Sequence, residues 1–405
     1  MMNDLDQLAI ENFREYLRIP SVHPDVNYDD CVTFVKNQAA SLGLPVQVYH
    51  CFPNKPIVIV TWIGREPDLP SILLNGHMDV VPVFKEEWTH DPFGAVMDEN
   101  GDIYARGAQD MKSTSIQYLE AIRRLKMDNV TLRRTIHVSF VPDEEILGAE
   151  GMGAFVKSKE FEELNVGFAL DEGAPNSVDA YRLFYGERNR WAIRIHCPGQ
   201  TGHGSLLLDN TAGEKVRKIL DKFYDLREQE KKKLDDDPSL NTGDVSTINL
   251  TVIEGGVQNN VIPSEFVISI DCRFAITVDL EEFEKTLNEW CEEAGEGVWI
   301  EFEAKIPRIP PTKLDETNPF WMAFKKTFDD MNAELQPQIF SAASDVRYLR
   351  AVNIPGLGFA PMNHTPVLAH AHDEYLNKDI FLRGIGIYYK VIPAVANVEE
   401  IPTQQ

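Results

Sequence analysis

Cysteine is scarce in this sequence. The five cysteines (Cys31, Cys51, Cys197, Cys272 and Cys291) are widely spaced, and no two of them form a Cys-x-x-Cys pair. An odd and scattered set of cysteines indicates neither the framework of a small disulfide-bonded protein nor a zinc site built from thiolates. The sequence therefore supports neither of these two classes.

Long apolar runs and an excess of positive charge are also missing. No run approaches the roughly 20 apolar residues that span a bilayer, and the acidic N-terminus has neither a signal-peptide core nor an Arg-rich transit pattern. With 39 basic and 64 acidic residues, the formal net charge is −25, which argues against nucleic acid or an anionic membrane surface as a partner. We therefore expect a soluble, cytoplasmic protein whose acidic surface serves solubility.

The chain is long enough for two domains. Its length of 405 residues exceeds what one ordinary core accommodates. Of these residues, 43% are hydrophobic, which is enough to fill the interiors of two domains. Short β-branched runs alternate with helical patterns in residues 1–187 and again in 309–405, which predicts one α/β domain with a parallel or mixed sheet. The predicted helices are residues 5–17, 28–42, 319–331, 380–391 and a helix after Asp110, and the predicted strands are 46–49, 57–62, 72–74, 103–104, 135–141, 167–170 and 356–360.

Residues 188–308 show a different pattern. Their predicted elements follow the order strand, helix, strand, strand, helix, strand, which is typical of a ferredoxin-like α+β domain. Pro307, Pro310 and Pro311 form a stiff linker behind it. We therefore predict a small domain, 188–308, inserted into the larger one. Its predicted elements are strand 191–195, helix 212–234, strands 246–253 and 266–274, helix 280–291 and strand 298–302.

Residues that can bind a metal follow several of the predicted strands. His77 and Asp79 come directly after strand 72–74 and lie on the same side of the chain, because strand side chains alternate with period two. Asp110 follows strand 103–104. Open α/β sheets build their sites beyond the carboxyl ends of their strands. Taken alone, each of these segments could equally be an ordinary polar loop.

Carboxylates are concentrated after two further strands. Asp143, Glu144 and Glu145 follow strand 135–141 directly, and three adjacent carboxylates repel one another unless a cation or solvent relieves them. Neighbouring residues of an extended segment point to opposite sides, so one glutamate could bind a metal while the other faces a bound water. A solvated turn is the alternative for an isolated acidic triplet. Asp171 and Glu172 are likewise carboxylates that directly follow a predicted strand, 167–170.

Two late histidines, His370 and His372, add imidazole to this set of carboxylates. Oxygen and imidazole ligands suit zinc, manganese or cobalt. Two such metals that share a carboxylate can hold a water between them, lower its pKa and polarise a carbonyl group. A glutamate that binds no metal can then act as general base and pass its proton to a leaving amine.

These motifs resemble a known family. His77-Met78-Asp79, the segment Gly107 to Lys112, Asp143-Glu144-Glu145 and His370 are similar to those of the aminoacylases, cytosolic N-acyl-L-amino-acid amidohydrolases of the dizinc exopeptidase and amidohydrolase superfamily. The resemblance runs from the first predicted helix to the last. It implies a zinc-exopeptidase-like mixed sheet flanked by helices, with an inserted lid domain that forms a homodimer. It also implies hydrolysis of small N-acyl-L-amino acids to a carboxylate and a free L-amino acid by metal-activated water.

The resemblance also assigns roles to residues. It implies two zinc ions per subunit (cobalt or manganese being possible), with Asp110 bridging them and Glu144 as general base. Asp79 would orient His77, and the Asp110–Met111 peptide bond would be cis. His370 is preferred over His372 because the family places this ligand four residues before a glutamate, here Glu374. The implied metal ligands are His77, Asp110, Glu145, Glu172 and His370.

Further roles fall on residues outside the metal ligands. By resemblance, His203 stabilises the oxyanion and reaches the metal site of the partner subunit, while Asn260 and Arg273 position the substrate. Glycines flank His203 and indicate an exposed imidazole, although a plain turn has the same pattern. Arg347 belongs to a Ser-Asp-x-Arg element, and its guanidinium suits the substrate α-carboxylate; a surface salt bridge is the alternative.

Departures from the family pattern are mild. Met78 replaces a common threonine and leaves the ligands intact, and Leu206, Leu207 and Leu208 could alter the acyl or side-chain preference. Two other functions stay open. A related dizinc dipeptidase or carboxypeptidase would prefer a free amino terminus on its substrate. A non-catalytic dimeric binding protein on this scaffold would be expected to lose the general base or a ligand, and this chain keeps them all.

Overall fold

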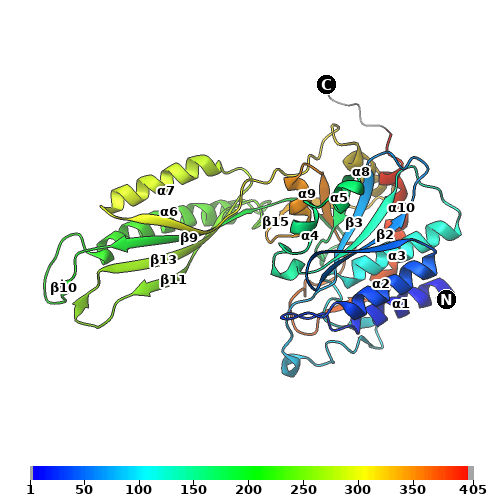
Figure 1. Ribbon diagram of the computed structural model, residues 1–405, viewed down its shortest axis with the longest axis horizontal. Helices are drawn as coiled ribbons and strands as arrows, with labels where there is room; N and C mark the ends of the chain where they lie inside the picture. Colours follow the sequence, from blue (N-terminus) through cyan, green and yellow to red (C-terminus); the bar gives the residue numbers. More distant parts are fainter. Residues whose placement is uncertain (1–2, 400–405) are drawn as a thin grey trace. The chain divides into compact units, whose positions relative to one another are not determined.

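The computed structural model describes residues 3–399, and the chain divides into two compact units (Figure 1). Unit 1 contains the residues up to Tyr185, Pro311–Pro337 and the residues from Ala343 onward. Unit 2 contains Gly186–Pro310 and Gln338–Ala342. Each unit has a sheet and a hydrophobic core of its own, so they are described separately.

An eight-stranded sheet organises unit 1. β3 is parallel to both of its neighbours, β6 and β7, and β7 is parallel to β16. β2 is antiparallel to both β1 and β6, and β8 is antiparallel to β16. The sheet is therefore mixed, as predicted. Its order is β1 (Val46–Phe52), β2 (Lys55–Trp62), β6 (Ile136–Val141), β3 (Ser71–His77), β7 (Val166–Asp171), β16 (Gly356–Phe359), β8 (Tyr181–Glu187) and β15 (Leu335–Phe340). A small sheet joins β17 (Tyr375–Asn377), β5 (Asp102–Tyr104) and β4 (Val96–Met97).

Helices cover both faces of this sheet, because alternate strand residues enter different cores. Leu74 belongs to the larger core, which contains residues of α1, α2, α3, α8 and α10, whereas Leu73 belongs to a smaller core with α4, α5 and α9. Gly43, in the left-handed conformation (φ 62°), ends α2 at Leu42, where the predicted helix 28–42 also ends. The helices are α1 (Asp4–Leu17), α2 (Asp29–Leu42), α3 (Lys112–Met127), α4 (Met152–Phe155), α5 (Lys159–Glu163), α8 (Pro319–Asp330), α9 (Val346–Ala351) and α10 (Lys378–Ala396).

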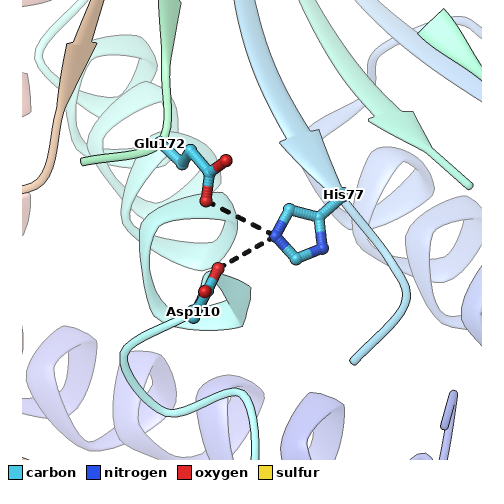
Figure 2. A group of neighbouring side chains, drawn as sticks. All are labelled: His77, Asp110 and Glu172. Carbon is cyan, nitrogen blue, oxygen red and sulfur yellow. Dashed lines mark hydrogen bonds and ion pairs between the residues drawn. The ribbon is translucent and has the colours of Figure 1, made fainter. Parts of the chain in front are cut away.

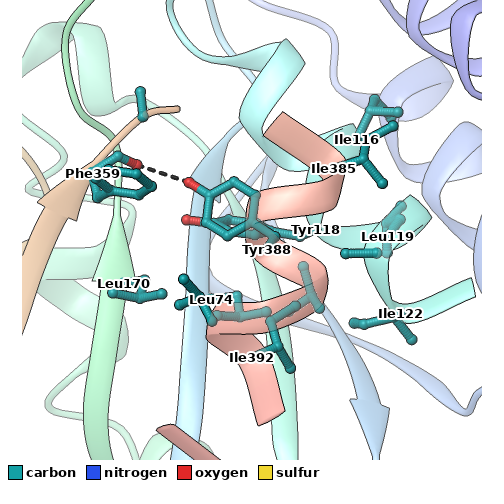
Figure 3. Packing of buried hydrophobic residues seen from close by; sticks show 14 of the residues in the cluster. Leu74, Ile116, Tyr118, Leu119, Ile122, Leu170, Phe359, Ile385, Tyr388 and Ile392 are labelled. Carbon is teal, nitrogen blue, oxygen red and sulfur yellow. Dashed lines mark hydrogen bonds between the residues drawn. The ribbon is translucent and has the colours of Figure 1, made fainter. Parts of the chain in front are cut away.

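α3 and α10 pack together within the larger core. Tyr118 of α3 meets Tyr388 of α10 edge to face, with ring centroids 4.6 Å apart, and both side chains are fully buried (Figure 3). The Tyr388 hydroxyl donates to the carbonyl oxygen of Phe359 at 2.9 Å, which satisfies a polar group that would be costly to bury alone. This packing fixes α3, the helix that follows Asp110.

Unit 2 is a four-stranded antiparallel sheet with two helices. Its elements occur in the order β9 (Asn189–Pro198), α6 (Ala212–Asp236), β11 (Thr247–Gly255), β13 (Glu265–Phe274), α7 (Leu280–Ala294) and β14 (Trp299–Lys305). The strands lie in the order β11-β13-β9-β14, and strand and helix residues share one core. The predicted β-α-β-β-α-β order is confirmed. A separate short pair joins β10 (Gly202–His203) to β12 (Val261–Ile262).

The length and the apolar character of a helix decide whether it can cross a membrane. Within residues 3–399, no helix combines the length and the apolar character that a bilayer crossing requires.

Candidate metal centre

Three neighbouring strands of unit 1 deliver side chains to one place. β6, β3 and β7 are parallel neighbours, so their carboxyl ends meet at the same edge. His77 is the last residue of β3, Glu145 follows β6, and Glu172 follows β7. Asp110 arrives from the loop before α3, and His370 from the loop between β16 and β17. The fold thus brings together five residues that the sequence singled out.

These five residues form two clusters with one shared member. In the first, the Nε2 atom of His77 lies 3.0 Å from Asp110 Oδ1 and 3.7 Å from Glu172 Oε2 (Figure 2). In the second, the Nε2 atom of His370 lies 3.3 Å from Asp110 Oδ2 and 3.1 Å from Glu145 Oε2. One potential ligand atom per residue lies within 4.8 Å of the others in each cluster. Asp110 therefore offers one oxygen to each cluster, as a bridging carboxylate does.

The donor set fits a pair of metal ions. Glu145 Oε1 is buried and accepts no hydrogen bond from any residue among 3–399, and an orphaned buried acceptor is a feature that a cation would relieve. Burial and the neighbouring charge of Asp110 raise the pKa of Glu145, and the same two causes raise that of Glu172 well above its ordinary value. Carboxylate and imidazole ligands are those that zinc, cobalt and manganese accept.

The imidazoles compensate these carboxylates in the absence of metal. Hydrogen bonds to Asp110 and Glu145 raise the pKa of His370 to about 10. Burial acts to lower the pKa of His77, but hydrogen bonds to Asp110 and Glu172 raise it well above its ordinary value. A metal bound at either cluster must displace these protons, because imidazole binds metals only when neutral.

The orientation of His77 is fixed by the backbone. Its Nδ1 atom lies 2.9 Å from the Asp79 carbonyl oxygen, which leaves Nε2 directed at Asp110 and Glu172. A metal-ligating histidine commonly donates its other ring N–H in this way. The Asp79 carboxylate, for which the resemblance implies this task, lies farther away, with Oδ1 3.7 Å from Nδ1.

The Asp79 carboxylate instead holds the segment that carries Glu144 and Glu145. It accepts the backbone N–H of Glu144 at 3.2 Å and that of Glu145 at 3.0 Å. Its Oδ2 also lies 2.8 Å from Nε2 of His23, and this hydrogen bond raises the pKa of His23. Because Asp79 is fully buried, these contacts hold the backbone that carries the two glutamates.

Asp143 fixes the same segment from the other side. It adopts a left-handed backbone (φ 65°), which allows the chain to turn sharply after β6. Its carboxylate accepts the Tyr28 hydroxyl at 2.7 Å and pairs with Lys55 Nζ at 2.5 Å. Asp143 is thus a support rather than part of either cluster, although the sequence shows it beside the two glutamates.

Glu144 is set apart from the metal ligands. It belongs to neither cluster, and burial, together with the negative charge of Glu172, raises its pKa well above the ordinary value. A carboxylate with a raised pKa accepts and returns a proton more readily near neutral pH. The arrangement suits a general base beside a metal pair.

The remaining candidates of unit 1 also lie near this segment. Arg347, on α9, is buried and donates to the carbonyl oxygen of Leu147, two residues after Glu145. Neither carboxylate oxygen of the buried neighbour Asp345 has a hydrogen-bond partner among residues 3–399. The Asp110–Met111 peptide bond is cis, as the resemblance implies.

The other expected site residues belong to unit 2. His203 is exposed on β10, and its Nδ1 atom lies 2.7 Å from Ser205 Oγ. Asn260 is exposed, and its carbonyl oxygen accepts the N–H of Gly204. Arg273, on β13, pairs with Asp271 at 3.1 Å. His203 pairs with Val261 of β12, and Asn260 directly precedes that strand.

Sequence reasoning missed several residues that support the centre. His23 is one of them, because nothing near it in the sequence marks it as a partner of Asp79. Gln109 lies in the segment Gly107 to Lys112, in which the resemblance gives it no role, Arg106 lies just before that segment, and Glu374 only identifies His370. The signal that identifies Arg106, Gln109 and Glu374 is their burial, which the structure reveals. Arginine, glutamine and glutamate are seldom fully buried without partners.

Comparisons with known proteins agree with this geometry. The model of peptidase family M20/M25/M40 matches residues 73–394. Aminoacylase-1 of Mus musculus is 51% identical over 97% of this chain and 97% of its own length, and aminoacylase-1 of Homo sapiens is 50% identical over 98% and 97%. The crystal structure of an M20 family metallo-carboxypeptidase from Sulfolobus solfataricus superposes with a TM-score of 0.68 at 20% identity, covering 98% of this chain and 100% of that one. The last similarity concerns the fold alone.

Proposed function

The chain belongs to peptidase family M20/M25/M40, and we propose that it hydrolyses N-acyl-L-amino acids to a carboxylate and a free L-amino acid. It is then an amidohydrolase that acts on a linear amide bond. The observation that carries the substrate class is the identity of about half its residues with aminoacylase-1 proteins, across almost the whole of both chains.

The residues divide the chemistry among them. His77 and Glu172 would hold one metal ion, and Glu145 and His370 would hold the other. Asp110 would bind both metal ions. Two bound zinc ions, or cobalt or manganese in their place, would polarise the amide carbonyl and acidify a water molecule at the centre. Glu144 takes the proton of the attacking water and delivers it to the leaving nitrogen. Asp79, through the N–H groups of Glu144 and Glu145, keeps that carboxylate in place.

Substrate contacts and assembly are part of the same proposal. Arg347 would bind the α-carboxylate, and Asn260 and Arg273 would position the substrate. His203 would stabilise the oxyanion at the metal centre of a partner subunit in a homodimer formed through residues 188–308. In this division, 1–187 and 309–405 form the catalytic domain and 188–308 the lid, and the enzyme works in the cytoplasm. The family resemblance supports these roles, of which that of His203 falls on the short strand β10.

A substrate panel tests the proposal. Release of free amino acid is measured from N-acetyl-L-methionine, from a long-chain N-acyl-L-glutamine and from an unblocked dipeptide, each with zinc and after chelation. We expect chelator-sensitive cleavage of the acylated substrates, and their ratio reports the preferred acyl group. If only the dipeptide is cleaved, the protein is a peptidase and not an aminoacylase. No turnover with metal bound would indicate a binding protein.

A further inference from the structure

Two of the proposed metal ligands reach the centre on loops that are far apart in sequence. Asp110 lies in residues 105–111, here called the Asp110 loop, and His370 in residues 366–375, the His370 loop. Neither ligand stands on a regular element. A two-metal site needs its ligands held within about half an ångström of the working geometry. The two loops therefore require a direct connection.

Glu374 provides one half of this connection. It is fully buried, and its two oxygens receive four donors from the Asp110 loop. Oε1 accepts the backbone N–H of Gln109 at 2.6 Å and that of Asp110 at 3.3 Å. Oε2 accepts the N–H of Gly107 at 3.2 Å and pairs with Arg106 Nη1 at 2.6 Å. One carboxylate of the His370 loop thus orders the backbone that presents Asp110.

Gln109 and Arg106 provide the other half. The buried Gln109 amide donates to the carbonyl oxygens of Pro366 at 3.0 Å and Tyr375 at 2.9 Å, and accepts the N–H of Leu368 at 2.9 Å. Arg106 Nη2 donates to the carbonyl oxygen of His370 itself at 3.3 Å. Side chains of the Asp110 loop therefore hold the His370 loop at both ends and at the ligand.

The His370 loop needs such support. His370 and Asp373 both adopt left-handed backbone conformations, with φ of 66° and 52°. This region is unfavourable for a residue with a Cβ atom, and such conformations persist when the surroundings over-determine them. The His370 side chain is also about half exposed, with a relative accessibility of 54%, so packing around the ring contributes less than at buried His77.

From these contacts we infer that Arg106, Gln109 and Glu374 are positioning residues that lock the Asp110 loop to the His370 loop and so set the affinity of the second metal site, formed by Asp110, Glu145 and His370. The inference rests on the proposed function, since it concerns the same two-metal centre. Residues that hold metal ligands commonly change metal affinity by about 10–100-fold when they are removed.

Zinc titration of the chelator-stripped protein tests this inference, with a chromophoric chelator as competitor. Wild type should bind two zinc ions per chain. Gln109→Ala should weaken one of them about 10–100-fold and the other much less, because His370 belongs to one cluster. Arg106→Lys keeps a cation beside Glu374 but is too short to reach the His370 carbonyl oxygen as well, so it should weaken the same zinc ion. This second variant decides the question if Gln109→Ala does not fold.

Gln117→Ala is the matched control. Gln117 is also a buried glutamine of unit 1, and it donates to the carbonyl oxygen of Phe381 at 3.0 Å. We expect it to lower the thermal unfolding temperature of the zinc-free protein much as Gln109→Ala does, while both zinc affinities stay unchanged. If wild type binds two zinc ions and both test variants bind them equally tightly, this inference is overturned, whereas the two-metal proposal stands. An equal loss in the control would also overturn it. A single zinc ion in wild type would overturn the two-metal proposal together with it.

Discussion

The two units hold their candidate residues in opposite ways. In unit 1, the His77 ring, the Asp79 carboxylate and Glu172 are buried, and neighbouring side chains and backbone groups fix their orientations. In unit 2, His203 and Asn260 are exposed, and the His203 ring forms its hydrogen bonds with Ser205, two residues away. A buried cluster reveals its chemistry through its own geometry. An exposed residue acquires a function from what approaches it, so its role has to be tested with that partner present.

The largest effect is expected in unit 1, from the residue proposed as general base. Glu144→Gln keeps the shape of the side chain but cannot take a proton, so kcat should fall by about 10²–10⁴-fold. Zinc content should be unchanged, because Glu144 belongs to neither metal cluster. Turnover and zinc content are measured on the same preparation. A zinc-replete variant with near wild-type turnover would remove Glu144 from this role.

The corresponding test in unit 2 concerns His203. His203→Asn should lower kcat by about 10²-fold if the imidazole stabilises an oxyanion. If it acts across a dimer, mixing this variant with Glu144→Gln should restore about a quarter of wild-type activity, since half the random dimers are mixed and each has one intact centre. His364→Asn, an exposed histidine of unit 1 paired with Asp179, is the control and should be neutral. Inactive mixtures of variants that exchange subunits would exclude action across the dimer.

A smaller effect is expected from the support beneath the glutamates. His23→Leu removes the hydrogen bond to Asp79 and should lower kcat by about tenfold, in the range typical of residues that hold ligands. His23→Gln keeps a donor and should recover much of this loss, whereas His50→Gln on the exposed surface should have no effect. Equal losses in the leucine and glutamine variants would indicate that the hydrogen bond is unimportant.

The smallest effect on activity is expected from a buried histidine outside the centre. Burial lowers the pKa of His137 to about 4, whereas the unfolded chain takes up this proton near pH 6.5. The unfolded state therefore binds more protons between these values, and stability should fall by about 3 kcal/mol as the pH drops from 6.5 to 4. His137→Gln should remove that part of the pH dependence. Denaturant unfolding at several pH values measures it, and parallel curves would contradict the assignment.

Much of the fold and of the centre was predictable, because local patterns coincide with the tertiary structure. Short apolar runs ending in polar residues identified β3, β6 and β7, and parallel pairing then placed His77, Glu145 and Glu172 together. Two strands of the same sheet, β8 and β15, were not predicted. β15 contains Gln336, Pro337 and Gln338, a composition typical of loops, and its pairing depends on distant segments.

The supports of the centre were not predictable, because they join positions far apart in the chain. His23 meets Asp79, and Glu374 meets Arg106, through tertiary contacts that no local pattern encodes. The Asp79 carboxylate shows the limit clearly. The position of Asp79 beside His77 suggests that its carboxylate orients the His77 ring. In the structure, the Asp79 carbonyl oxygen contacts that ring, and the Asp79 carboxylate accepts the N–H of Glu144 in the segment after β6.

The order of the ligands along the chain has a consequence for synthesis on the ribosome. Four of the five donors precede residue 173, whereas His370 comes close to the end. An emerging chain therefore carries four donors long before the fifth, but the Asp110 loop depends on Glu374 of the same late segment. Domains generally fold as units, and unit 1 is completed only by the residues from Ala343 onward. Both metal clusters should therefore form only after the late segment has been made, and a chain released early would lack the contacts that order the shared ligand Asp110.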